Sequence, residues 1–326
     1  MAYKRYLALI GVVLFIFIML QQDLEEIVRI LSGANPWLFL FVGFLSLLTG
    51  AIKGYRWSLI MKSAGIEVPV LQAIKFFYIG FFISLFTPGR VGEAARALYV
   101  RPWSKSVSKA LPTIMVDRLM DIVLLVILSI VAVFGLASVF GILVMDPVLL
   151  AAIAIGFSIA LAFFFRKGAV AFVLRPFFSM FVPEKMKDKL QVSFHNFYDA
   201  LKKSLSSRKL LAVSFLLTCV SWTISIILGW LLLLAINVDT VPLYYMAFVM
   251  PILSLLDMLP VSVSGVGVRE AGAIPLLGLM AVTSEQAVSF SLLVLVAGYL
   301  FTFALGGLLM AREKINPLDE FKEILK

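Results

Sequence analysis

The sequence predicts an all-α polytopic membrane protein. Hydrophobic residues make up 62% of its 326 positions and charged residues only 14%, whereas a soluble domain has roughly 45–50% apolar and ~25% charged residues. The mean hydropathy is +1.06. Several apolar runs approach the ~20 residues that a spanning helix needs, and most basic residues lie between these runs. We expect a single membrane domain over residues 1–326, with about six full transmembrane helices and two re-entrant helical hairpins.

Six apolar runs are predicted to cross the membrane completely. The first, residues 6–20, follows Lys4 and Arg5, which favours a cytoplasmic N-terminus. A cleaved signal peptide is disfavoured, because charged residues separate this run from residues 32–34, which resemble a cleavage site. The other runs are residues 36–60, 110–140, 148–165, 210–236 and 287–310. The last run ends at Arg312, so both termini are predicted to be cytoplasmic.

Residues 70–100 are predicted to form the first re-entrant hairpin. An apolar run to Phe86 is interrupted by Pro88 and Gly89, where a continuous helix would be near the middle of the membrane. Basic residues flank both sides of this segment, so we expect it to enter and leave on the cytoplasmic side. Interrupted backbone at that depth is tolerated only where it is buried in protein or lines a water-filled cavity.

A second hairpin is predicted for residues 242–283, where residues 260–270 separate two apolar runs. The final helix can end in the cytoplasm only if this hairpin enters from outside. Both interruptions contain Gly, Val, Gly, Glu and Ala in the same order, once gaps are allowed. Hairpins that enter from opposite faces and share this pattern favour an inverted repeat, which is typical of transporters with a site near the midplane.

The longest polar segment, residues 166–209, carries ten basic and three acidic residues. Aromatic and aliphatic residues alternate with these charges, so we expect a cytoplasmic amphipathic segment that binds the anionic inner leaflet. The net charge of +9 is explained by loops of this kind. We therefore do not expect nucleic acid as a partner.

Charged residues at membrane depth cost ~3 kcal/mol each even on lenient insertion scales, so they are candidates for function. They fall into four groups: Arg90, Glu93 and Arg96; Asp117, Arg118 and Asp121; Asp257; and Arg269 and Glu270. Asp117 and Asp121 share one helix face at i, i+4, and we expect them either to exchange protons during transport or to pair with a cation such as Arg118. Lys53 and Arg56 are expected to extend to the inner interface.

The two interruptions combine residue types that suit an anionic group. Glycines let backbone N–H groups turn toward a ligand, the start of a half-helix carries partial positive charge, and serines and arginines add donors. The residues expected to bind substrate are Arg90, Glu93, Arg96, Ser262, Ser264, Gly265, Gly267, Arg269 and Glu270. The alternative is that Glu93 with Arg96, and Arg269 with Glu270, form structural ion pairs. Both interpretations stay open at this point.

Metal and redox chemistry are disfavoured by the residues. Cys219 is the only cysteine and His195 the only histidine, so an internal disulfide and a Cys/His zinc site cannot form. Catalysis by a histidine would need partners that the basic stretch around His195 does not supply. We expect no cofactor and no metal, and a transporter rather than an enzyme.

Four motifs occur in a fixed order along the chain: Arg56-Trp57, PGRVGEAAR at 88–96, DRLMD at 117–121 and LPVSVSGVGVREAG at 259–272. Over nearly its whole length the sequence resembles the flippase-like membrane domain of the lysylphosphatidylglycerol synthase family. In some members this domain is fused to an aminoacyl-transferase domain and moves aminoacylated lipid between leaflets. Others stand alone or accompany polyprenyl-phosphate glycosylation. Residues 312–326 are too few for a transferase domain, so the resemblance implies the stand-alone form, without aminoacyl transfer.

We therefore expect a multi-pass lipid translocase of the plasma membrane, with an anionic phospholipid or a polyprenyl-phosphate-linked lipid as its substrate. The anion site comes from the residues, and lipid movement is what the resemblance implies. A membrane-embedded transferase acting on a lipid-linked sugar or phosphate is an alternative, with Asp117, Asp121 or Asp257 as acid or base. A small-solute carrier is another. The sequence leaves the oligomeric state open, with a homo-oligomer among the expected forms.

Overall fold

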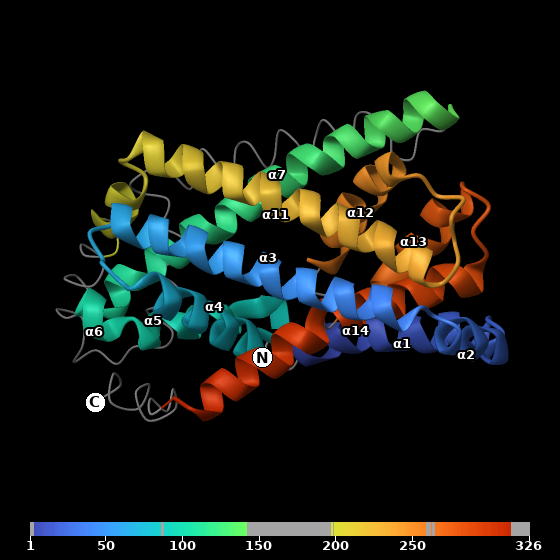
Figure 1. Ribbon diagram of the computed structural model, residues 1–326, viewed down its shortest axis with the longest axis horizontal. Coiled ribbons are helices and arrows are strands. Elements are labelled where there is room, and N and C mark those ends of the chain that lie inside the picture. Colours follow the sequence, from blue (N-terminus) through green and yellow to red (C-terminus); the bar gives the residue numbers. More distant parts are fainter. Residues whose placement is uncertain are drawn as a thin grey trace.

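The computed structural model describes residues 3–85, 88–141, 197, 199–258, 262 and 265–313, and for residues 3–10 and 88–91 it describes the backbone alone. In this part of the chain all regular secondary structure is helical. The helices form an elongated bundle, and α3, α11 and α14 run along its length (Figure 1). The prediction of an all-α protein is confirmed.

Within the described ranges, four helices are long and apolar enough to cross a membrane: α3 (Pro36–Ser63), α7 (Val107–Phe140), α11 (Arg208–Ala235) and α14 (Ser284–Ala311). Each agrees to within a few residues with a predicted crossing run, which confirms a polytopic membrane protein. The first predicted run corresponds to α1 (Tyr3–Leu20). It is followed by the short helix α2 (Leu24–Ser32). The predicted run at 148–165 and most of the basic segment 166–209 lie outside the described residues.

Polar caps fix where the long helices begin. The Asn35 side chain accepts hydrogen bonds from the backbone N–H groups of Trp37 and Leu38, at 3.0 and 3.3 Å, before α3. Thr283 and Gln286 accept each other's backbone N–H groups in a capping box before α14. Each cap satisfies donors that have no partner inside the helix, which stabilises the helix by about 1 kcal/mol.

Helices α3 and α11 pack against each other in opposite directions. At one end, the Asn35 N–H donates to the carbonyl oxygen of Ala235 at 2.7 Å. At the other end, the Ser63 hydroxyl donates to the carbonyl oxygen of Ser204, just before α11, at 2.9 Å. The segment that follows α3 and the segment that follows α11 therefore begin at opposite ends of the bundle (Figure 1).

Both of these segments are interrupted helices, as predicted. The first contains α4 (Val70–Leu85), the 3-10 helix η1 (Pro88–Ala95), α5 (Arg96–Tyr99) and α6 (Arg101–Ser104). The second contains α12 (Leu243–Asp257) and α13 (Val268–Gly278). A proline and a glycine stand at the start of the first interruption, and two glycines with positive φ stand at the end of the second.

The order of elements occurs twice. A 28-residue helix, an apolar helix of 15 or 16 residues, an interruption, at least one short helix and a second long helix follow one another in α3–α7 and again in α11–α14. Because α3 and α11 are antiparallel, the two series run in opposite directions. This arrangement supports the inverted repeat that the glycine motifs predicted.

Apolar side chains fill the bundle and also cover much of its outside. One buried cluster surrounds Tyr245 and Phe290 between α11 and α14, and another surrounds Trp57 and Phe76 between α3 and α7. Large apolar side chains such as Phe134 are exposed on the long helices. An exposed apolar surface of this extent is what a bilayer covers.

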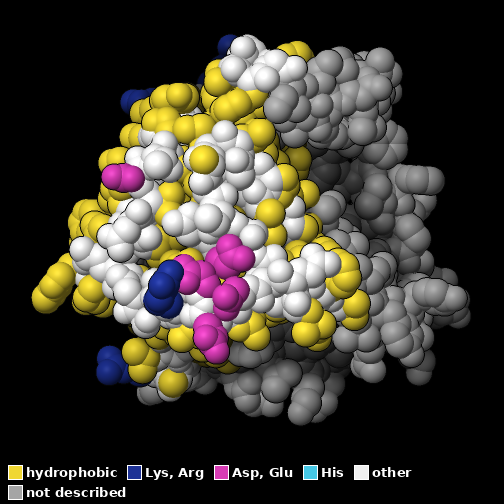
Figure 2. All heavy atoms as spheres, turned by 90° about the vertical axis from the view of Figure 1, so that its right-hand side faces the viewer, with side chains coloured by type: hydrophobic (Ala, Val, Ile, Leu, Met, Phe, Trp, Pro, Cys, Tyr) yellow, Lys and Arg dark blue, Asp and Glu magenta, His cyan; other side chains and the backbone are white. Residues whose placement is uncertain are grey.

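One end of the bundle carries acidic side chains (Figure 2). Asp23, Glu25 and Glu26 cap and begin α2 at this end, and Arg29 pairs with Glu26. Basic residues, among them Lys62, Arg208 and Lys209, lie where α3 ends and α11 begins, at the opposite end of the bundle. By the positive-inside rule the acidic end is therefore expected to face outward. Placement in the plasma membrane with both termini inside stays a prediction.

Candidate functional site

Arg56 of α3 is completely buried, and every N–H group of its guanidinium has an acceptor. Nε donates to Asp117 Oδ1 at 2.8 Å. Nη1 donates to Asp121 Oδ1 at 2.7 Å and to Thr218 Oγ1 at 2.8 Å. Nη2 donates to the carbonyl oxygen of Asp117 at 3.2 Å and to Asp121 Oδ2 at 3.0 Å. With two carboxylates from α7 and a hydroxyl from α11, Arg56 joins three long helices.

Arg96, the first residue of α5, is 1% exposed and shares Asp117 with Arg56. Its Nη2 donates to Asp117 Oδ2 at 2.8 Å. The guanidinium carbon lies 4.5 Å from the ring centroid of Trp57 and 5.2 Å from that of Phe77. Trp57 is itself fixed by a 3.0 Å hydrogen bond to Thr113. The Nε and Nη1 atoms of Arg96 have no hydrogen-bond acceptor.

Three further side chains extend this buried group. Lys53 Nζ lies 3.4 Å from Asp121 Oδ2, and Glu93 of η1 forms an ion pair with Arg118 of α7. We call the set the α7 charge cluster, and its members are Lys53, Arg56, Glu93, Arg96, Asp117, Arg118 and Asp121. Four of these side chains are cationic and three are carboxylates.

Two sequence predictions about this cluster are wrong. Glu93 pairs with Arg118 and Arg96 with Asp117, rather than with each other, because α7 lies close enough to offer a partner to both. Arg56 does not extend to the interface, since three helices close around it. Asp117 and Asp121 do pair with cations, but chiefly with Arg56.

The second interruption ends in a tight backbone turn before α13. Gly265 and Gly267 have φ values of +84° and +85°, a region that residues with a Cβ rarely adopt. Glu270 Oε2 accepts the N–H of Gly267 at 2.6 Å, and its Oε1 accepts the Ser291 hydroxyl of α14 at 2.7 Å. Glu270 therefore caps α13 and attaches it to α14, and its charge is favourable at a helix N-terminus.

Arg269 closes the interruption by binding the last residue of α12. Its Nε donates to both Asp257 carboxylate oxygens, at 3.0 and 3.1 Å, and its Nη2 donates to Asp257 Oδ2 at 2.6 Å. The predicted pair of Arg269 with Glu270 is wrong, because consecutive helical residues point about 100° apart. We call Asp257, Arg269 and Glu270 the α13 charge cluster.

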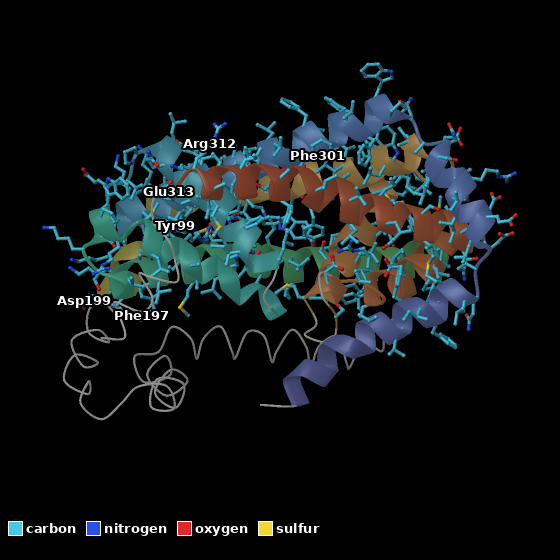
Figure 3. The ribbon with its side chains drawn as sticks, turned by 90° about the horizontal axis from the view of Figure 1, so that it is seen from below. Tyr99, Phe197, Asp199, Phe301, Arg312 and Glu313 are labelled. Atoms are coloured by element: carbon cyan, nitrogen blue, oxygen red, sulfur yellow. The ribbon has the colours of Figure 1, made fainter. Side chains whose placement is uncertain are left out.

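Helix α14 connects the two interrupted segments. The Tyr299 ring centroid lies 5.9 Å from the guanidinium carbon of Arg269 and stacks on Phe81 of α4, with the ring centroids 5.9 Å apart. Directly after α14, Glu313 forms an ion pair with Lys75 of α4 and lies near Tyr99 of α5 (Figure 3). Helix α14 and the residue after it therefore contact both interrupted segments.

The predicted substrate-binding residues fall into two groups rather than one. Glu93 and Arg96 belong to the α7 charge cluster, and Gly265, Gly267, Arg269 and Glu270 lie at the second interruption. The Ser262 hydroxyl is buried and has no hydrogen-bond partner. Ser264 and the side chain of Arg90 lie outside the described residues. Among the residues described, no group of three or more His, Cys, Asp and Glu side chains could hold a metal.

Comparison with known proteins decides the family. A family model described as the lysylphosphatidylglycerol synthase TM region matches residues 6–306. The chain belongs to this family. A UPF0104 membrane protein of Pyrococcus horikoshii is 23% identical over 334 residues, which cover 95% of this chain and 98% of that protein. Another from Methanothermobacter thermautotrophicus is 24% identical over 309 residues, with 87% and 90% covered.

In this member of the lysylphosphatidylglycerol synthase TM-region family, sequence reasoning missed the role of Arg56, Trp57 and Thr218. A signal for Arg56 was present. Two carboxylates on one face of an apolar helix, Asp117 and Asp121, require a buried cation with several donors. Arginine supplies five N–H groups in a rigid plane. Trp57 was noted only as part of the Arg56-Trp57 motif, without a role, and Thr218 gave no signal, because a hydroxyl is common in apolar helices.

Gly267→Ala is expected to displace α1 from the second interruption of this family member. A Cβ at Gly267 would lie 2.0 Å from the carbonyl oxygen of Gly11 and 2.9 Å from the backbone nitrogen of Phe15. The positive φ adds about 1–3 kcal/mol of strain. We expect a lower midpoint of thermal unfolding in detergent. Gly278→Ala, at the other end of α13, meets nothing within 4 Å and is the matched control. Equal midpoints for the two variants would contradict this description of the contact.

Proposed function

We propose that the protein moves an anionic lipid, either a phospholipid or a polyprenyl-phosphate-linked lipid, between the two leaflets of the membrane. The observation that carries the proposal is the pair of interrupted helices that begin at opposite ends of the bundle, each with a buried charge cluster. Transporters with inverted repeats use such elements to expose one interior site to each side in turn. The lipid tail would stay in the bilayer while the headgroup passes the charged groups.

The roles of the residues follow from their chemistry. Arg90, Arg96 and Arg269 would supply positive charge to an anionic headgroup, since a guanidinium binds phosphate strongly. Ser262 and Ser264 would add hydroxyl donors, and Gly265 and Gly267 would leave room for close approach of the backbone. Glu93 and Glu270 would hold the elements around the site, through Arg118 and Ser291. The description of the family names a lipid, which supports a lipid as the cargo.

Leaflet exchange in reconstituted liposomes tests the proposal. The full chain is placed in liposomes with headgroup-labelled fluorescent phosphatidylglycerol, or with a labelled polyprenyl phosphate, and a membrane-impermeant quencher is added. We expect the quencher to reach the inner-leaflet label over time, while protein-free liposomes protect it. An entrapped soluble dye checks that the vesicles stay sealed.

The same preparation separates the alternatives. Failure to exchange any phospholipid or polyprenyl phosphate would contradict a translocase. Product formation from a lipid-linked sugar in detergent, where no second compartment exists, would support a transferase instead. Saturable uptake of a soluble anion into empty liposomes would support a small-solute carrier.

A further inference from the structure

Arg56 and Arg96 contact the same carboxylate, that of Asp117, but they differ in how many of their guanidinium N–H groups have an acceptor. We infer that Arg96 is the binding group for a phosphate oxyanion of a lipid headgroup, and that a singly charged phosphodiester fits it best. Arg56 has a structural role. This inference rests on the proposed function for the identity of the ligand as a lipid, and it assigns the headgroup chemistry that one cluster recognises.

The two arginines differ in the number of hydrogen bonds that they make within the protein. All five N–H groups of Arg56 donate to acceptors within the protein, so Arg56 has nothing left to offer a ligand. Arg96 donates only through Nη2, to Asp117. Its Nε and Nη1 are buried without an acceptor. Buried donors of a charged group are rarely left unpaired in a native protein, unless a ligand or an ion completes them.

The side chains around Arg96 fix its position but do not accept hydrogen bonds from its unpaired N–H groups. The ring centroids of Trp57 and Phe77 lie 4.5 and 5.2 Å from the guanidinium carbon, and these rings carry no oxygen that could accept its N–H groups. On α4, a Cβ at Gly80 would come within 3.2 Å of Arg96 Cβ, so the glycine allows the side chain to lie against that helix. A cation fixed in this way loses little freedom when it binds an anion.

The charges of the α7 charge cluster indicate which anion fits. The Glu93–Arg118 pair is neutral on its own. The remaining cations, Lys53, Arg56 and Arg96, face two carboxylates, Asp117 and Asp121. Among these described side chains one positive charge is left over. Arg56 has all its donors paired and Lys53 is 25% exposed, so Arg96 is the fully buried cation of the three that has donors to offer. A phosphodiester carries one negative charge, whereas a phosphomonoester carries closer to two at neutral pH.

Access to these donors requires a conformational change. Arg96 is 1% exposed, so the described state is closed around it. A headgroup can reach Nε and Nη1 only when neighbouring side chains move aside. That requirement agrees with alternating access, in which the site opens to one side at a time.

Calorimetric titration of the full chain in a non-ionic detergent tests the inference. The probes are short-chain phosphatidylglycerol as the diester, short-chain phosphatidic acid as the monoester, inorganic phosphate, and short-chain diacylglycerol as the uncharged control. We expect the diester to bind most tightly and the diacylglycerol not to bind. Arg96→Gln should weaken diester binding about tenfold or more, because it removes the charge and most donors. Lys62→Gln, at an exposed position on α3, should leave it unchanged.

Variants that keep the fold make the result decisive. If Arg96→Gln is unstable because Asp117 loses a partner, the double variant Arg96→Gln/Asp117→Asn removes both charges together, and diester binding should still be lost. Wild-type affinity in a folded Arg96 variant would overturn the inference. Inorganic phosphate that binds as tightly as the diester would overturn the lipid assignment, and tighter binding of the monoester would overturn the charge argument.

Leaflet exchange measured on the same protein separates this inference from the proposed function. Binding that depends on Arg96 without leaflet exchange would leave the inference standing and contradict the translocase. Exchange that continues at the wild-type rate in Arg96→Gln would leave the translocase standing and overturn the inference.

Discussion

Arg56→Gln is expected to lower the free energy of unfolding by about 3–5 kcal/mol, because removing one partner leaves buried charges uncompensated. The substitution breaks up to five hydrogen bonds and leaves Asp117 and Asp121 beside one cation fewer. It also loosens the contact of α3 with α7 and α11. The measurement is the unfolding midpoint in detergent, with the yield of folded protein as a second readout.

Two control variants make this result specific to the buried network. Lys62→Gln removes a cation six residues further along α3, where the side chain is exposed, and should change stability by less than about 0.5 kcal/mol. Arg56→Gln/Asp121→Asn removes a charge of each sign and should recover part of the loss. A midpoint for Arg56→Gln equal to that of the wild type would show that the α7 charge cluster does not hold these helices together.

Arg269→Gln is expected to reduce leaflet exchange to the level of protein-free liposomes while the protein remains folded. Arg269 is the single cation of the α13 charge cluster, where two carboxylates accompany it. Without it, Asp257 and Glu270 would repel an anionic headgroup. The link between α12 and α13 and the contact with Tyr299 would also be lost. The readout is the rate at which the quencher reaches inner-leaflet label.

The control variants separate the effect of losing the positive charge of Arg269 from the effect of losing its contact with Asp257. Arg269→Lys keeps the charge but not the planar group that binds both Asp257 oxygens, so partial activity is expected. Asp257→Asn/Arg269→Gln keeps the charge balance and tests whether the fold survives. Arg312→Gln changes an exposed arginine after α14 and should exchange lipid normally. Wild-type exchange in Arg269→Gln would remove the second interruption from the lipid path.

The sequence was sufficient to predict the four long helices and both interruptions. Runs of apolar residues marked α3, α7, α11 and α14, because membrane thickness sets their length. Pro88 and Gly89, and later Gly265 and Gly267, marked the positions where the backbone leaves the helix. These are local properties, and local sequence determines them. Counting crossings also predicted that the two interrupted segments begin at opposite ends of the bundle, whereas their re-entry into the membrane stays a prediction.

The sequence was not sufficient to predict which charges pair. Residues close in sequence were expected to be partners, but Arg96 binds Asp117, 21 residues away, and Arg56 binds Thr218, 162 residues away. A buried charge pairs with whatever the packed helices bring to it, and helix packing is a tertiary property. The same reason explains why Arg56 was expected at the interface. Its position near the end of α3 is compatible both with a side chain that extends to the interface and with a buried one, and only the neighbouring helices decide between them.

The burial of Arg56 has a consequence for how the chain is made. Asp117 and Asp121 are 61 and 65 residues beyond it, and Thr218 is 162 residues beyond it, so α3 leaves the ribosome long before its partners exist. At that stage Arg56 is seven residues from the end of its helix, or about 10 Å. A long side chain can reach the interface over such a distance. We therefore expect Arg56 to point to the membrane surface during biogenesis, until α7 inserts and supplies the carboxylates. The buried network of Arg56 can be complete only after both α7 and α11 have been made.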